Sequence, residues 1–275
     1  MKPRSNPCAR VKPCTGVCEL EAGRSALREI DWDAPWLAHW TALGPGFQRA
    51  LAQGQALPEL LNTHLRAPVR FVRQADLPEG QAYESFIGEH AAVPTREGLH
   101  DTFNALCWHQ WPQSKRRLNR LQVAEIGRLG IGTVRGPVRD ALTLIDENAL
   151  LLQAPDALWQ ALLARDWRRL FWDERDAWQQ ARVGVVGHAL LEKLHQPYKS
   201  ITAHVWAVPV PPALGDDWAA WDGWFAQELS AERLASKPLT PLPVLGIPGW
   251  WAANQDPAFY NDTQVFRAPR ASLGA

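Results

Sequence analysis

Residues 183–195 read Val-Gly-Val-Val-Gly-His-Ala-Leu-Leu-Glu-Lys-Leu-His. The first five residues are small or β-branched, which is typical of a short buried strand. The leucines that follow have helical spacing, so the chain is expected to change from strand to helix at His188. The start of a helix directly after a buried strand is a position where ligands often contact side chains in α/β architecture. His188 is therefore the first candidate for a residue of a functional site.

Three polar residues lie on one face of this predicted helix. His188, Glu192 and His195 are at i, i+4 and i+7, within about 60° of arc. A histidine and a carboxylate one turn apart can share a metal ion, or the carboxylate can orient the imidazole as a base. The order differs from the zincin motif, in which two histidines lie at i and i+4. The alternative is a solvated face stabilised by a Glu–His pair.

A second candidate pair lies on a predicted helix at residues 99–111, which ends before Pro112. His100 and Asn104 are one turn apart at the edge of its apolar stripe. Polar groups directed toward packed surface need partners, so the pair either has a structural role or belongs to a site. Asp101 falls on the far side of the helix, near its start, where a carboxylate can cap free N–H groups.

Further candidates have weaker signals. His204 alternates with its neighbours on a β-rich run and could supply another nitrogen near His188, or be an ordinary strand residue. Asp146 and Glu147 could add oxygens to a site, although we expect them in an exposed turn. The basic run at residues 115–117 could hold a phosphate or a nucleic acid strand, or form a solvated face.

The remaining pattern predicts an α+β fold, a mostly helical single domain around a small β-sheet. The sheet is expected to contain a hairpin at 141–152 and strands at 183–187 and 201–208. The segment 238–249 holds four prolines, so we expect it to be extended and not a central strand. The predicted domain spans residues 29–268. We expect a flexible N-terminal extension at residues 1–28 before it and a tail at residues 269–275 after it.

Composition excludes several classes of protein. The 275 residues include 29 basic and 29 acidic side chains and are 46% hydrophobic, so the chain lacks the high net charge of disordered proteins and a globally basic surface. No stretch reaches the roughly 18 uncharged apolar residues of a membrane helix. The N-terminus has no apolar signal-peptide core, so we expect a cytosolic protein without a membrane partner.

Cysteine and tryptophan carry less information. Cys8, Cys14 and Cys18 cluster in the N-terminal extension, but only the last two have zinc-like spacing and no fourth ligand is nearby, so their role is left open. Most of the 15 tryptophans are expected to pack inside the protein, with a stacking platform for sugars or bases as the alternative. The absence of a P-loop and of a Gly-x-Ser-x-Gly elbow disfavours nucleotide hydrolysis by a P-loop and serine-type acyl transfer.

Several longer motifs resemble a bacterial domain-of-unknown-function family, number 3025. They are Pro94-Thr95-Arg96 with Leu99–Leu106, Arg139–Thr143 with Asp146-Glu147-Asn148, Gly187–Lys193, and Pro241–Trp251. The resemblance covers roughly residues 30–268 and implies no particular reaction.

The leading hypothesis is a cytosolic enzyme, such as a hydrolase, with a pocket for a small-molecule ligand. It would be formed by His100, Asn104, His188, Glu192 and His204, and a divalent metal ion is compatible with it but not required. The rival hypothesis is a non-catalytic binding or scaffold protein whose tryptophans and proline-rich C-terminal segment form a partner surface. A weaker alternative is nucleic-acid binding through the basic run, which predicts a steep dependence on salt.

Overall fold

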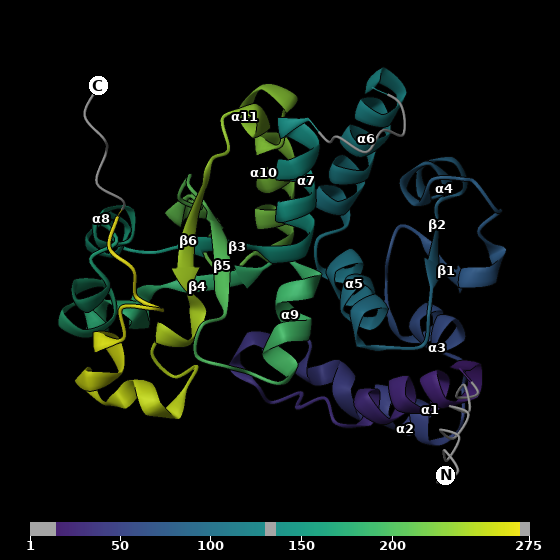
Figure 1. Ribbon diagram of the computed structural model, residues 1–275, viewed down its shortest axis with the longest axis horizontal. Coiled ribbons are helices and arrows are strands. Elements are labelled where there is room, and N and C mark those ends of the chain that lie inside the picture. The colour runs from purple at the N-terminus through teal and green to yellow at the C-terminus, as the bar shows by residue number, and fades with distance from the viewer. Residues whose placement is uncertain (1–14, 130–135, 270–275) are drawn as a thin grey trace, which may run out of the picture.

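The strand and the helix expected at residues 183–195 are both present in the computed structural model, which describes residues 15–129 and 136–269 (Figure 1). They are β4 (Arg182–Val185) and α9 (His188–His195). Gly187 joins them, and a Cβ on this residue would overlap the backbone of Glu147 and Asn148. Glycine thus lets α9 begin directly against the end of α7 (Pro137–Asn148).

The main sheet has four strands in the order β4-β3-β5-β6. Its central strand β3 (Ala149–Gln153) is buried along its whole length. It pairs antiparallel with β4 and parallel with β5 (Thr202–Trp206), which pairs antiparallel with β6 (Leu239–Pro243). The two single strands predicted at 183–187 and 201–208 are therefore both present in this sheet.

The proline-rich segment begins with the edge strand β6. Val244 N donates to Ile201 O just beyond the strand, so the even-numbered amides of this segment face β5. Pro241 and Pro243 consequently occupy positions whose missing N–H groups would point away from the sheet. Residues 239–243 are thus extended at the sheet edge as predicted, whereas residues 244–246, also expected to be extended, form a 3-10 helix.

The hairpin predicted at residues 141–152 is wrong. Residues 137–148 form the helix α7, and only residues 149–153 form a strand. The alternating residues of Leu142–Ile145 suggested a strand, but the buried residues of the segment also fit helical spacing, at Val138, Ala141, Leu142 and Ile145. Pro137 at the first turn favours the helical alternative, because its missing N–H would be unsatisfied there in any case.

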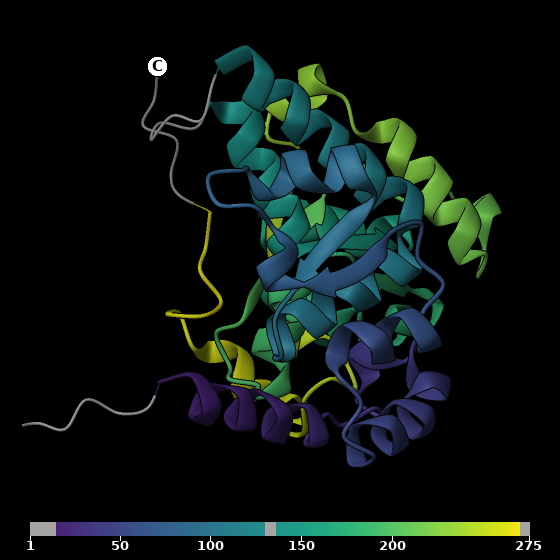
Figure 2. The ribbon, with the colours of Figure 1, turned by 90° about the vertical axis from the view of Figure 1, so that its right-hand side faces the viewer.

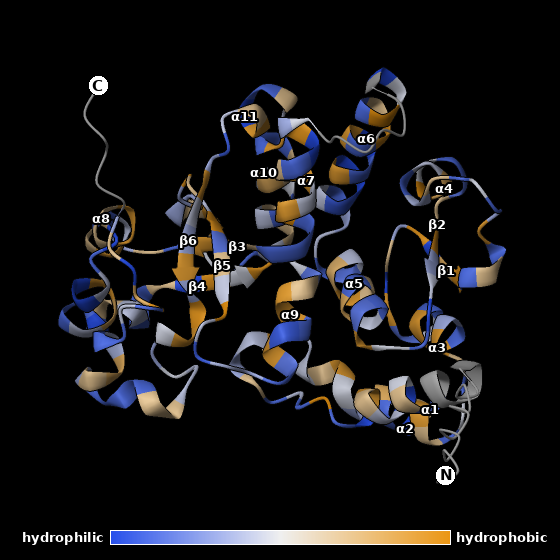
Figure 3. Ribbon diagram, in the orientation of Figure 1, coloured by the Kyte–Doolittle hydropathy of each residue, from blue (hydrophilic) through white to orange (hydrophobic). Residues whose placement is uncertain are grey.

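Four helices stand between the main sheet and a second, two-stranded parallel sheet (Figure 1). They are α5 (Leu99–Gln110), α6 (Pro112–Leu129), α7 and α9. Figure 3 shows hydrophilic and hydrophobic residues alternating around α6 and α7, which is the pattern of amphipathic helices. The small sheet contains β1 (Arg70–Arg73) and β2 (Ala92–Thr95), and α4 (Tyr83–His90) lies between these strands in the sequence.

Other helices surround this arrangement. Residues 218–235 form two helices, because Ser230 caps a new short helix after the first one ends. The remaining α-helices are α1 (Thr15–Arg28), α2 (Gly44–Ala52), α3 (Leu57–His64), α8 (Asp156–Ala164), α10 (Trp218–Glu228) and α11 (Ala231–Ala235).

The N-terminal extension differs from the expected flexible segment where it is described. Residues 15–28 form α1, which lies at the same end of the molecule as α2 and α3 (Figure 2). Leu27 is fully buried, and Arg24 pairs with Glu97 at 3.1 Å. Of the three clustered cysteines, Cys8 and Cys14 lie outside the described residues and Cys18 is part of α1.

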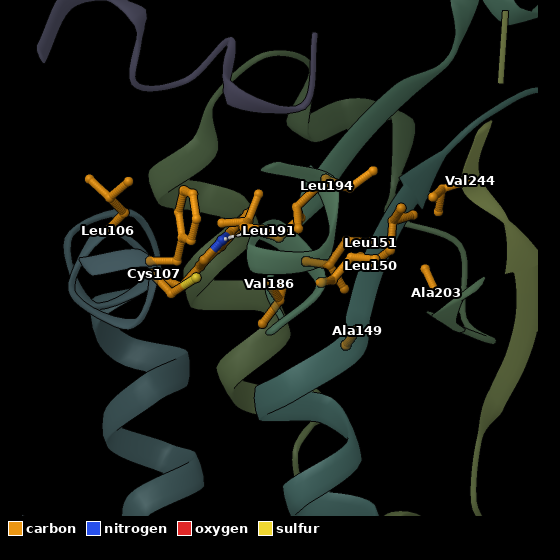
Figure 4. Close-up of a cluster of buried hydrophobic side chains, with 14 of the residues drawn as sticks. Leu106, Cys107, Ala149, Leu150, Leu151, Val186, Leu191, Leu194, Ala203 and Val244 are labelled. Atoms are coloured by element: carbon orange, nitrogen blue, oxygen red, sulfur yellow. Dashed lines mark hydrogen bonds between the residues drawn. The ribbon is translucent and has the colours of Figure 1, made fainter. Parts of the chain in front are cut away.

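The core is continuous from the helices into the main sheet. Figure 4 shows side chains of α5, α9, β3 and β5 gathered in one cluster, including Leu106, Leu191, Leu150 and Ala203. Nine of the 15 tryptophans are buried and the other six are half-buried, which confirms that most of them pack inside the protein. The fold is thus the predicted one, a mostly helical α+β single domain with small sheets. None of its helices in the described ranges is both long and apolar enough to span a bilayer.

Candidate functional site

A polar cavity of about 500 Å³ lies among α4, α5, α6, α7 and the start of α9. Three of the five residues predicted from sequence, His100, Asn104 and His188, line it. Further lining residues carry polar groups that sequence reasoning undervalued or missed, and they are Tyr83, Glu84, Lys115, Asn119 and Asp146. The cavity is large enough for a small-molecule ligand.

The two candidate histidines touch each other. His188 Nε2 lies 3.1 Å from His100 Nε2, and the rings are nearly perpendicular. His100 Nδ1 lies 2.8 Å from Glu192 Oε2. The packing of α5 against α9 thereby aligns the imidazole of His100 with the imidazole of His188 and the carboxylate of Glu192, which come 88 and 92 residues later in the sequence.

The partners of each ring nitrogen indicate which nitrogens of His100 and His188 carry hydrogen. His188 Nδ1 is buried and lies 3.5 Å from Asp146 Oδ2, too far for an ordinary hydrogen bond but favourable for a nitrogen that carries hydrogen. His188 Nε2 then carries no hydrogen, and its lone pair accepts a hydrogen bond from His100 Nε2–H. His100 Nδ1–H donates to Glu192. His100 is therefore the charged ring and His188 the neutral one.

The electrostatic environment favours the same assignment. The hydrogen bond to Glu192 raises the pKa of His100 above 6.5, although partial burial opposes the shift. Burial lowers the pKa of His188 to about 4. The hydrogen bond to His100 also lowers the pKa of Glu192. His100 therefore holds a proton more readily than His188 does, and Glu192 is the more readily ionised for its contact with His100.

A second series of hydrogen-bonded side chains meets the first at Asp146. Lys115 Nζ donates to Asp146 Oδ1 and, at 2.9 Å, to Asn104 Oδ1. Asn104 Nδ2 donates to the hydroxyl of Tyr83 at 3.3 Å. Asn104 therefore connects a buried ammonium group to a phenol across the cavity wall.

These contacts set the charges of the second series. Burial, the largest single cause, raises the pKa of Asp146, but the charge and the hydrogen bond of Lys115, together with the nearby His188 and His100, hold this pKa below its usual value. Burial, together with the charge of Asp146, raises the pKa of Glu84. Burial also raises the pKa of Tyr83, so its hydroxyl keeps its proton at neutral pH. The wall thus combines an ionised acid, an ammonium group and a hydroxyl donor.

Lys115 is positioned by the start of α6. The helix begins at Pro112, and the carboxylate of Asp222 on α10 accepts from the backbone N–H groups of Gln113 and Ser114 at 2.8 Å each. This buried carboxylate caps the first turn of the helix, while the Ser114 hydroxyl donates to the Asp222 carbonyl. With its first turn fixed, α6 places Lys115 inside the protein, where it is only 4% exposed.

Asp101 also differs from its expected capping role. Its carboxylate accepts from the backbone N–H of Arg96, before α5 begins, and from the Arg96 guanidinium. Asp101 therefore fixes the chain segment that leads into α5, just before His100, the residue that faces His188.

Of the other candidates, His204, Arg116 and Arg117 do not line the cavity. His204 lies on β5 opposite Ala149 and Pro241, away from the cavity lining, and burial followed by the charge of Lys193 lowers its pKa. The basic run at residues 115–117 does not form a patch, because its members point to different partners. Arg116 donates to Pro68 O, and Arg117 donates to Leu229 O.

The residues that sequence reasoning undervalued had a partial signal. Once residues 137–148 are recognised as a helix, Asp146 falls one turn after Leu142, next to the buried stripe. Similarly, Lys115 precedes the cavity residues Leu118, Asn119 and Gln122 at helical steps. Tyr83 had no such signal, since its contact with Asn104 depends on how α4 packs.

The described residues do not fit a metal centre. In the ranges 15–129 and 136–269 no group of three or more His, Cys, Asp or Glu side chains is arranged to hold a metal ion. The nitrogens of His100 and His188 that face each other are joined by one hydrogen bond. We therefore derive no step through a metal.

The fold and the cavity define a mostly helical α+β protein with a buried acid–base cluster. Residues 69–270 match the family of proteins of unknown function DUF3025, and the chain belongs to this family. The matched region begins later than the expected residue 30 and contains the whole cavity lining. Neither the curated proteins nor the solved structures include a significant match.

Proposed function

We propose that this protein is an enzyme that transfers protons to and from a small polar molecule bound in the cavity. The observation that carries the proposal is the contact between His100 and His188 at the cavity wall, with Glu192 behind the first ring. Two histidines with opposite pKa shifts provide an acid and a base at the same pH.

Each residue has a defined role in this proposal. When a bound molecule takes the place of the hydrogen bond between the two rings, Nε2 of neutral His188 accepts a proton from it and Nε2–H of charged His100 donates one to it. Glu192 holds His100 in its charged form. Asn104, fixed between Lys115 and Tyr83, positions the bound molecule. Hydrolysis is one reaction of this kind and stays a prediction.

The test uses a metabolite extract incubated with the full-length protein and followed by mass spectrometry. We expect the wild-type protein to consume at least one compound, and His188→Asn to slow its loss by about 100-fold, a typical general acid–base contribution. His204→Asn, which changes a histidine outside the cavity lining, is the matched control and should retain the activity. An extract left unchanged by the wild-type protein, or consumed equally by His188→Asn, would overturn the proposal.

The rival binding hypothesis has less support from the structure. None of the 15 tryptophans is exposed, and only Leu163 and Tyr198 are large exposed apolar side chains in the described ranges. A cytosolic location is part of our proposal and rests on the composition of the chain. The bacterial origin of the protein is a prediction from the family resemblance.

A further inference from the structure

A lysine at position 115 is unusual for this protein. Only six of the 29 basic residues in the chain are lysines, and arginine forms most of the other ion pairs of the described residues. Among the described residues lining the cavity, the one lysine is nearly fully buried. An arginine could also pair with Asp146, but only a lysine amine can act as a nucleophile.

The neighbours of Lys115 include a proton acceptor and a hydrogen-bond donor that can assist a reaction at its amine. Asp146 accepts a hydrogen bond from Nζ and can take its proton. Tyr83, one hydrogen bond beyond Asn104, keeps its proton and can donate to an oxygen atom in the cavity. The ring of Trp108 lies 5.5 Å from Nζ and limits access of water from that side. Base, nucleophile and hydrogen-bond donor thus line one cavity.

We propose that Lys115 forms a Schiff base with the carbonyl carbon of an aldehyde or ketone bound in the cavity. This inference rests on the proposed enzyme function and names its substrate class. Polarising the carbonyl oxygen is the role of the Tyr83 hydroxyl, and the pair of histidines then moves protons on the bound carbon skeleton.

The bond changes balance without an additional reagent. The Lys115 ammonium gives one proton to Asp146, and the free amine attacks the carbonyl carbon while the π electrons move to oxygen. A proton moves from nitrogen to this oxygen, giving a neutral carbinolamine. Asp146 returns its proton to the hydroxyl, which leaves as water as the nitrogen lone pair forms the C=N bond. The products are a protonated imine and one water molecule, and the total charge is unchanged.

Reductive trapping tests this directly in the full-length protein. We would incubate it with glycolaldehyde or with pyruvate in the presence of sodium cyanoborohydride, which converts an imine to a stable amine. Peptide mapping by mass spectrometry then gives the labelling rate of each lysine. We expect Lys115 to be labelled about tenfold faster than the exposed Lys193, as activated amine nucleophiles are.

Variants separate reactivity from structure. Asp146→Asn keeps the amine but removes its base, so labelling of Lys115 should slow, while Lys193→Arg should leave it unchanged. A lysine that serves only in a buried ion pair would be labelled more slowly than Lys193 by both probes in the wild-type protein, and this result overturns the inference.

The two proposals fail in distinguishable ways. Loss of extract turnover in His188→Asn without labelling of Lys115 would retain the enzyme and reject the Schiff base. Labelling of Lys115 without any extract turnover would retain the reactive lysine and reject the enzymatic role assigned to the histidines.

Discussion

His188 becomes harder to protonate when the chain folds. Its ordinary pKa is 6.5, and burial lowers it to about 4 in the folded protein. Between these values the unfolded chain binds more protons than the native protein, so the free energy of unfolding falls as the pH falls. The difference corresponds to about 3 kcal/mol of stability lost by pH 4.

The first prediction follows from this shift. In urea unfolding at pH 7, 5.5 and 4.5, His188→Asn should lose less stability on acidification than the wild type. His100 provides the opposite control, because its raised pKa contributes stability that is complete below pH 6.5 and is lost as the pH rises through the folded value. Parallel pH profiles of the wild type and His188→Asn would contradict the assignment of a neutral buried ring.

The Lys115–Asp146 pair gives a second prediction. Asp146→Ala leaves a buried ammonium group without its counter-charge, and we expect a loss of about 3 kcal/mol in urea unfolding. Replacing both partners, as Lys115→Met with Asp146→Leu, should recover most of this loss, because neither charge then remains buried.

A surface ion pair serves as the control for this experiment. Asp216→Ala breaks the exposed pair with Arg182 and should barely change stability. If Asp146→Ala has no larger effect than Asp216→Ala, then Lys115 is solvated and not buried as described.

At the scale of elements, Gly187 determines how α9 meets α7. Gly187→Ala places a methyl group against the backbone at residues 147–148, so we expect a loss of about 3 kcal/mol in thermal or urea unfolding. The pKa of His188 measured by NMR should move toward 6.5, because displacement of α9 exposes its first residue. Gly127→Ala in α6 is the control: its Cβ meets open space, and alanine should stabilise the helix by about 0.5 kcal/mol. A neutral effect of Gly187→Ala would show that the junction is not closely packed.

The sequence was most informative where one periodic pattern fitted alone. The change from β4 to α9 could be predicted because small and β-branched residues are followed by leucines with helical spacing. Residues 141–148 were misassigned because the same residues fit both periods, and tertiary packing decided in favour of α7.

The candidate site was predictable only in part, for a related reason. His100 and His188 stood out as polar residues on largely apolar helices, yet their contact depends on the packing of α5 against α9. Asp146 was assigned to an exposed turn as a consequence of the misassigned hairpin. Tyr83 could not be connected to Asn104 from local spacing, because the contact joins two different helices.

At the scale of the whole molecule, α1 is part of the folded body. Leu27→Ala should cost about 3 kcal/mol in urea unfolding, because its side chain is fully buried. Leu163→Ala is the matched control, since Leu163 is 58% exposed and should change stability little. If Leu27→Ala unfolds at the same urea concentration as the wild type, α1 does not contribute to the stability of the core.

The two prolines of β6 also govern how the molecule meets copies of itself. A free sheet edge normally offers a row of amide hydrogens on which another polypeptide can grow an intermolecular sheet. Since Pro241 and Pro243 remove these hydrogens on the outward side, an incoming strand would find acceptors without matching donors. The edge that ends the sheet is thereby protected against fibril-like growth.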